Sequence, residues 1–242
     1  MLGPLWHFLQ PLFSSFIFAF AFAFIAKLST QDVPPVLFYL SGIIPWTYFA
    51  DCTNRTSGTF TANAGVFGKV YFPRLAVPVS VVISNLIKFC IQLFLFAIIY
   101  FFYFLQGNRS FQANGYLLLT PILVFLMAIF GLGIGLIVSA LTTRYRDLAN
   151  LVGFGVQLLM YLSPVIFPMS MWQEIAQKHP KVLWIIYSNP MTSVIETFRL
   201  GFLGLGSYDP FHLSYSALMS LFILFLGLFT FSRMEKTFID TV

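Results

Sequence analysis

The residues with the clearest chemical potential form a short charged group, Arg144-Tyr145-Arg146-Asp147, between two long apolar segments. Charged side chains are costly in hydrocarbon, so this group is expected at a membrane surface. Taken alone, its two arginines are interpreted as a topology signal, which keeps the loop on the inner side of the membrane.

A second group combines aromatic and basic side chains over Asn63–Arg74, at the end of a predicted inner loop. Its aromatic and basic members are Phe67, Lys69, Tyr71, Phe72 and Arg74. This mixture suits a short amphipathic helix that lies along the membrane. Such a helix either anchors the chain at the interface or docks into a cytoplasmic partner, and the residues support both roles equally.

Lys88 lies within an apolar segment, with Asn85 three residues before it and Gln92 four residues after it. On a helix these positions share one face, which must point into the protein or a cavity rather than into lipid. The stripe is suited to contacting an anionic or hydroxyl-rich substrate. Alternatively, Lys88 extends to the inner surface or is neutralised by a carboxylate such as Asp51.

The apolar stretch 182–205 carries two charged residues, Glu196 and Arg199, and is interrupted at Asn189-Pro190. A lipid-facing span with these charges would be expensive. Irregular backbone at membrane depth is tolerated where protein or a water-filled cavity covers it. We therefore predict a re-entrant helical hairpin on the outer side of the membrane rather than a seventh span.

Several aromatic residues, among them Trp46, Tyr48 and Tyr161, lie near the ends of apolar segments. An interfacial belt explains such positions, because amphipathic rings favour the membrane boundary. A sharper interpretation is that some of these rings line a passage and stack on the apolar faces of sugar rings. Composition alone leaves both interpretations open.

These residues must be positioned by helices that cross a membrane. The 242-residue chain is 59% hydrophobic and 9% charged, whereas a soluble domain is about 25% charged. We predict an all-α membrane protein with a single domain over 1–242. Stretches of about 20 apolar residues predict six transmembrane helices, over 5–26, 36–58, 77–105, 116–141, 148–167 and 213–231. Gly131, Gly133 and Gly135 in the fourth are expected to allow close helix packing.

An even number of spans places both termini on one side of the membrane. With that side cytoplasmic, the inner loops contain Arg55, Lys69, Arg74, Arg144, Arg146, Arg233 and Lys236. The outer loops contain Lys27, Arg109, Lys178, Lys181 and Arg199. The excess of basic residues on the inner side agrees with the positive-inside rule and supports cytoplasmic termini.

The sequence contains no pattern typical of a catalytic or metal site. His7, His179 and His212 are far apart, and Cys52 and Cys90 lack metal-ligand spacing. The acidic residues do not cluster, which argues against a membrane-embedded sugar transferase with a carboxylate pair or a metal-bound diphosphate. No basic run indicates nucleic-acid binding, and no phosphate-binding loop indicates that this chain binds ATP.

Taken in order, a set of short motifs resembles a known family. The motifs are Leu2-Gly3-Pro4-Leu5-Trp6, Ser41-Gly42-Ile43-Ile44-Pro45-Trp46-Thr47-Tyr48-Phe49, Lys69-Val70-Tyr71-Phe72-Pro73-Arg74, Arg144-Tyr145-Arg146-Asp147, Leu162-Ser163-Pro164-Val165-Ile166-Phe167-Pro168, and Asn189-Pro190-Met191 before Glu196-Thr197-Phe198-Arg199. Each is weak alone, but their order is specific. The sequence resembles permease subunits of ABC exporters for surface polysaccharides, the O-antigen (Wzm-like), teichoic-acid and capsule branch.

The resemblance implies a homodimer in the bacterial inner membrane, bound to two separate subunits that hold ATP and Mg²⁺. This chain would need no cofactor of its own. The expected substrate is a glycan linked to undecaprenyl pyrophosphate, or a close lipid-linked analogue, which is exported through a path at the dimer axis. Membrane lipids are expected as further partners. A sister exporter of drugs or small lipids is an alternative function, as is the sugar transferase considered above.

The resemblance also assigns roles to the candidate residues. The segment Asn63–Arg74 would be the coupling helix that docks into the ATPase, and the loop Thr143–Asp147, with Arg144, Tyr145, Arg146 and Asp147, would be a second cytoplasmic contact with it. The predicted substrate path includes Trp46, Tyr48, Phe49, Lys88, Gln92, Tyr161, Glu196 and Arg199. Phosphate favours charged donors, so Arg74, Lys88 and Arg146 are candidates for contacting the pyrophosphate.

The N-terminus departs from the family pattern. Family members usually carry some tens of residues before the Leu2–Trp6 motif, including a basic amphipathic helix at the cytoplasmic interface. Here Met1 directly precedes the motif. We expect that the sequence is a truncated reading frame, an expectation that the intact mass of the native protein can test.

Overall fold

The computed structural model describes residues 6–67, 73–142, 145 and 147–240. Every regular element in this part of the chain is a helix, so the predicted all-α class is confirmed. The elements are α1 (Trp6–Phe18), a π-helical continuation η1 (Ala19–Ile25), α2 (Pro35–Ser57), α3 (Thr59–Phe67), α4 (Ala76–Leu105), a short η2 (Gly115–Leu119), α5 (Thr120–Thr142), α6 (Leu148–Tyr161), α7 (Met169–Lys178), α8 (Lys181–Ser188), α9 (Pro190–Leu203) and α10 (Pro210–Asp240).

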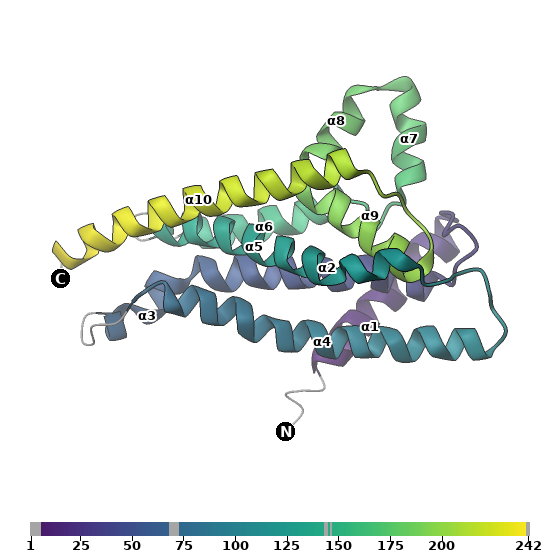
Figure 1. Ribbon diagram of the computed structural model, residues 1–242, viewed down its shortest axis with the longest axis horizontal. Coiled ribbons are helices and arrows are strands. Elements are labelled where there is room, and N and C mark those ends of the chain that lie inside the picture. Colours follow the sequence, from purple (N-terminus) through teal and green to yellow (C-terminus); the bar gives the residue numbers. More distant parts are fainter. Residues whose placement is uncertain (1–5, 68–72, 143–144, 146, 241–242) are drawn as a thin grey trace.

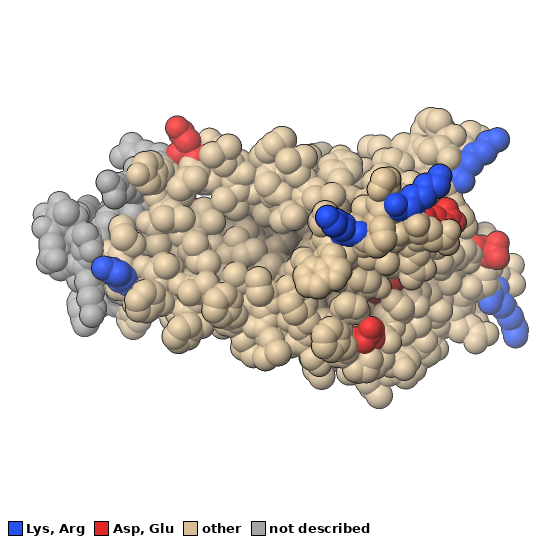
Figure 2. All heavy atoms as spheres, turned by 90° about the horizontal axis from the view of Figure 1, so that it is seen from above, with Lys and Arg blue, Asp and Glu red and all other residues tan. Residues whose placement is uncertain are grey.

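Four helical segments among the described residues are long and apolar enough to cross a membrane. They are Trp6–Ile25, Ala76–Leu105, Gly115–Thr142 and Pro210–Met234. The helices α2 and α6 lie alongside them in the bundle (Figure 1). A broad part of one face between the ends of the molecule carries no charged side chain, as a lipid-facing surface requires (Figure 2).

Two helices differ in length from their predicted spans. α6 ends at Tyr161, whereas the predicted span continued to residue 167. The intervening residues form turns before Pro168, because Pro164 and Pro168 lack the N–H that a helix requires. In contrast, α10 is longer than predicted and continues into the charged tail.

α5 lies at the centre of the bundle, between α2 and α10. A Cβ atom on Gly133 would lie 2.7 Å from the backbone nitrogen of Leu224 in α10. On Gly135, it would lie 2.5 Å from Cβ of Thr56 in α2. The prediction that these glycines permit close helix packing is therefore confirmed.

The connections gather at the two ends of the bundle. α3 lies at the same end as the C-terminus of α10 (Figure 1). The α1–α2 and α4–η2 connections lie at the opposite end, where α7 and α8 project from the bundle (Figure 1). The helices thus separate the predicted coupling segment from the predicted re-entrant segment.

Candidate functional site

The helix α9 places the charged residues of the predicted re-entrant segment inside the bundle. It begins where the Asn189 side chain accepts a hydrogen bond from the N–H of Met191 at 3.0 Å, with Pro190 in the first turn. It ends at Gly204, whose φ of 71° suits glycine. Residues 190–199 are all buried. The predicted break at Asn189-Pro190 is confirmed, and it separates two helices, α8 and α9.

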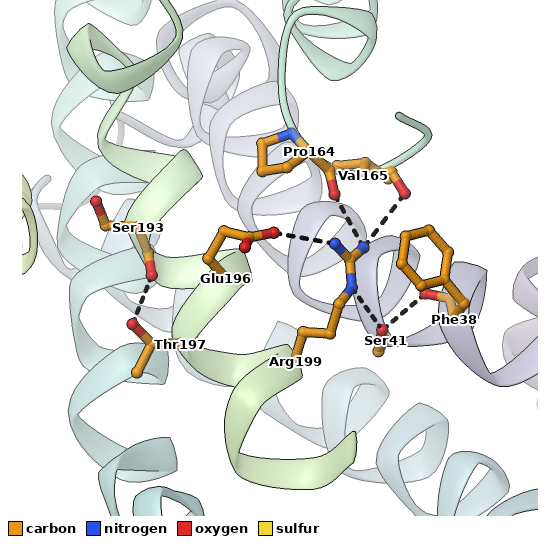
Figure 3. Close-up of polar contacts among 8 residues, drawn as sticks. All are labelled: Phe38, Ser41, Pro164, Val165, Ser193, Glu196, Thr197 and Arg199. Carbon is orange, nitrogen blue, oxygen red and sulfur yellow. Dashed lines mark hydrogen bonds and ion pairs between the residues drawn. The ribbon is translucent and has the colours of Figure 1, made fainter. Parts of the chain in front are cut away.

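Arg199 is only 1% exposed, yet each of its nitrogens has a partner. Nη1 donates to Oε1 of Glu196 at 3.1 Å (Figure 3). Nη2 donates to the carbonyl oxygens of Pro164 at 2.9 Å and Val165 at 3.5 Å. Nε donates to Oγ of Ser41 at 3.3 Å. The planar guanidinium reaches all these acceptors because its donors point in several fixed directions.

Two residues of α2 shape the space around this guanidinium. The Phe38 ring lies 4.0 Å from its central carbon, in a cation–π contact. Gly42 leaves room for it, because a Cβ atom there would lie 3.0 Å from Nη2 of Arg199 and 3.0 Å from the Val165 carbonyl oxygen. Close by, Nδ2 of Asn189 donates to Oγ of Ser163 at 2.7 Å.

We call Phe38, Ser41, Gly42, Pro164, Val165, Glu196 and Arg199 the Arg199 site. It joins three segments: α2, the turns after α6, and α9 (Figure 3). All its members except Phe38 belong to the sequence motifs described above. The site is closed and its charges are paired, so in this conformation it holds segments together. A role for Glu196 and Arg199 in a substrate path remains a prediction that requires these segments to separate.

Lys88 pairs with Asp51 across α4 and α2, with Nζ 2.6 Å from Oδ2. The two side chains are 11% and 24% exposed. The alternative in which Asp51 neutralises Lys88 is therefore confirmed. On the same face of α4, Nδ2 of Asn85 lies 3.8 Å from Sγ of Cys52. Gln92 is buried, and its Nε2 has no hydrogen-bond partner among the described residues.

The Lys88–Asp51 pair makes a substrate role separable from a structural one. Lys88→Met leaves the Asp51 carboxylate without its partner, which is expected to lower the free energy of unfolding by about 1–3 kcal/mol. The yield of folded protein is therefore expected to fall. The double variant Asp51→Asn/Lys88→Met removes both charges and is expected to restore yield but not transport. Measuring transport and yield for each variant distinguishes the two roles. Normal transport by the double variant would show that Lys88 has only a structural role.

The aromatic candidates do not form one surface. Trp46, Tyr48 and Phe49 are 4%, 2% and 1% exposed, and Phe49 stacks on Phe130 of α5 with ring centroids 5.1 Å apart. Tyr161, at the end of α6, is 43% exposed. The first three thus contribute to the core of the chain, and their predicted role in a substrate path requires α2 to move from its neighbours.

The structure describes part of the predicted coupling segments. α3 begins before the predicted segment and contains Asn63, whose Nδ2 donates to the Thr59 carbonyl at 2.9 Å. Arg74 is buried, whereas Tyr145 and Asp147 are exposed. Outside the described residues lie Lys69, Tyr71, Phe72, Arg144 and Arg146, together with the side chain of Phe67.

Phe60 is a candidate that the sequence analysis missed. Its ring stacks on Phe231 of α10, with centroids 4.5 Å apart, and both rings pack with Leu136 of α5. Its N–H donates to Oγ of Ser139 in α5 at 3.3 Å. Phe60 therefore attaches α3 to two long helices. The available signal was its position as the single large apolar residue in the otherwise small and polar stretch 57–65.

Within the described part of the chain, no three His, Cys, Asp or Glu side chains are grouped to hold a metal ion. Cys52 is buried and Cys90 exposed, both as free thiols. Lys88 with Asp51 and Arg199 with Glu196 instead form ion pairs between oppositely charged side chains.

Comparison with known proteins identifies the family. The ABC-2 type transporter family matches residues 1–203. The chain is 29% identical to the O-antigen export system permease protein RfbA of Klebsiella pneumoniae, over 98% of this chain and 86% of that protein. It is 25% identical to the polysialic acid transport protein KpsM of Escherichia coli, over 99% and 89% of the two chains. The capsule polysaccharide export inner-membrane protein CtrC of Neisseria meningitidis serogroup B is 22% identical, over 97% and 84%. The chain belongs to the ABC-2 type transporter family.

Proposed function

We propose that this chain is the permease subunit of an ABC exporter that moves a lipid-linked polysaccharide, such as an O-antigen, across the bacterial inner membrane. The observation that carries the proposal is similarity over 98% of the chain to a permease named for O-antigen export. The Arg199 site supports it, because three of the motifs on which the resemblance to the polysaccharide exporters rests contribute residues to this site.

The proposed arrangement has six membrane crossings, with α1–η1, α2, α4, η2–α5, α6 and α10 as spans and α9 as part of a re-entrant segment. Both termini and α3 face the cytoplasm. Two copies of the chain bind two ATP-hydrolysing subunits, which hold ATP and Mg²⁺. The positions of α3 and of the C-terminal end of α10 at one end of the bundle support this arrangement (Figure 1).

In the proposed mechanism, ATP-driven movement of the partner subunits reaches α3 first. Phe60 passes this movement to α5 and α10, because it contacts both helices. α2 moves with α9 and with the turns after α6, because the Arg199 site ties them together. When these helices separate from the same helices of the second subunit, a path for the glycan opens between the two subunits. Lys88, Arg74 and Arg146 are the candidate contacts for its pyrophosphate.

The coupling role of Phe60 predicts a specific defect. Phe60→Ala removes the ring that lies between α3 and α10, so export is expected to fall at least about tenfold, within the range of typical coupling energies. ATPase subunits should still copurify, because the substitution changes no residue of the predicted coupling segment Asn63–Arg74. Phe229→Ala is the control, since Phe229 is 59% exposed on α10. Equal export by the two variants would contradict the coupling role.

The function itself is tested in a bacterial strain whose own O-antigen permease gene has been deleted. This strain still synthesises the lipid-linked glycan and keeps the ATPase that served the deleted permease. Expression of the chain with its cognate ATPase is expected to restore surface polysaccharide, and the ATPase should copurify in equal amount. Polysaccharide that stays inside the cell, from a complex that assembles normally, would exclude that glycan as substrate. A chain that copurifies with no ATPase would refute the transporter assignment.

A further inference from the structure

An open cleft of about 910 Å³ lies between α4, η2 and α5. Its lining is almost entirely hydrocarbon: only Cys90, Tyr100 and Thr120 carry a polar side-chain atom. Phe101 and Leu118, two of its lining residues, are 59% and 81% exposed. The cleft therefore opens at the surface of the chain rather than inside the bundle.

Both walls of this cleft belong to segments long and apolar enough to cross a membrane, Ala76–Leu105 and Gly115–Thr142. Water in an apolar cleft would lack the two to four polar partners that ordered water needs. In a membrane, the occupant must itself be hydrocarbon. An acyl chain satisfies this condition.

A second cleft, of about 520 Å³, continues from the first at the end of α4 and shares Tyr100, Phe101 and Ala113 with it. Its lining includes Arg109 and Gln112. Arg109 is exposed and forms no hydrogen bond or ion pair with any residue that the structure describes. A cationic group thus lies next to the end of an apolar cleft, as an anionic amphiphile requires.

Tyr100 is held in place where the two clefts meet. Its ring packs edge-on against Phe111, with centroids 4.7 Å apart. Its hydroxyl accepts a hydrogen bond from the N–H of Ala113 at 3.1 Å. This side chain therefore forms a fixed boundary between the apolar cleft and the polar one.

We propose that the two clefts form a binding site for a membrane phospholipid, with one acyl chain between α4 and α5 and the phosphate against Arg109. The bound lipid is a resident of the membrane, separate from the exported glycan. Charge favours a lipid over a second copy of this chain. A two-fold contact through the same surface would bring Arg109 of each copy to one interface, where like charges repel.

Cys90 provides a direct measurement, because it lines the apolar cleft and is exposed whereas Cys52 is buried. The full chain, purified in mild detergent with any subunits that copurify, is alkylated by a maleimide while phosphatidylglycerol is added. Alkylation of Cys90 is expected to slow several-fold and to reach a plateau. Diacylglycerol with the same acyl chains, which lacks phosphate, is expected to protect only at higher concentration.

Two variants test the two halves of the site. Arg109→Gln is expected to raise the half-saturating phosphatidylglycerol concentration about tenfold, as loss of a charge-assisted hydrogen bond predicts. Ala97→Phe fills the apolar cleft and is expected to abolish retention of phosphatidylglycerol in native mass spectrometry. Lys178→Gln and Ala76→Phe are the matched controls, since both residues are exposed outside the clefts.

Three outcomes would overturn the proposal. Equal protection of Cys90 by diacylglycerol and phosphatidylglycerol would show that the phosphate does not contribute to binding. Unchanged lipid retention in Ala97→Phe, with a normal elution profile, would show that no acyl chain occupies the apolar cleft. A disulfide between Cys90 residues of two copies after mild oxidation would assign the cleft to a subunit interface. Export plays no part in these measurements, so they stand apart from the test of the proposed function.

Discussion

Replacement of Arg199 by leucine is expected to lower the free energy of unfolding by about 3–5 kcal/mol, because it leaves a buried carboxylate without its partner. Glu196 is 3% exposed and cannot regain water without moving α9. The carbonyl oxygens of Pro164 and Val165 and the hydroxyl of Ser41 also lose the donor they share. The yield of monodisperse protein and the midpoint of thermal unfolding in detergent measure the effect.

The double variant Glu196→Leu/Arg199→Leu separates an unpaired charge from other damage. It removes both charges, so it is expected to be more stable than Arg199→Leu. Arg199→Lys is expected to restore little, because an ammonium group cannot reach acceptors on three segments in the geometry of a guanidinium. Lys181→Leu, at an exposed position on α8, controls for the loss of a positive charge. A double variant no more stable than Arg199→Leu would refute the charge explanation.

The same variants connect the Arg199 site with transport. The site is proposed to make α2, α9 and the turns after α6 move together. Any double variant that folds should therefore assemble with the ATPase and hydrolyse ATP, yet export less glycan for each ATP consumed. Export at the wild-type ratio would confine the site to a structural role.

Sequence reasoning predicted those features that depend on local chemistry. Long apolar stretches predicted most helix positions, and Asn189-Pro190 predicted the break between α8 and α9, since proline supplies no N–H to a continuing helix. Asp51 was correctly identified as an alternative partner for Lys88, because the cost of an unpaired charge in a membrane restricts the choices to the few acids nearby.

The features that sequence reasoning missed depend on how distant segments meet. Ser41 and Arg199 are 158 residues apart, and no periodicity in the sequence indicates that they share a hydrogen bond. Phe60 appeared to be one apolar residue in a polar stretch, and only the positions of α5 and α10 explain it. The extent of α6 was overestimated, because apolar composition continues through turns that proline imposes.

A second large loss of stability is expected where α5 and α10 cross, at Gly133 and Gly227. Replacing either glycine by alanine adds only one methyl group. A Cβ atom on Gly227 would lie 2.5 Å from the carbonyl oxygen of Gly133, and one on Gly133 would lie 2.7 Å from the backbone nitrogen of Leu224. These neighbours are backbone atoms, which cannot rotate away as a side chain can. Gly227→Ala and Gly133→Ala must therefore force the two helices apart.

Each of these variants is expected to lower stability by about 1–3 kcal/mol, as overpacking of a core does. Gly155→Ala in α6 is the matched control, since a Cβ atom there would have no neighbour within 4 Å. Because alanine favours a helix over glycine by about 1 kcal/mol, the control should be stabilised while the two crossing variants are destabilised. The opposite signs distinguish packing from helix propensity in thermal unfolding of the purified chain. Stabilisation of Gly227→Ala would show that α5 and α10 do not cross as closely as these distances require.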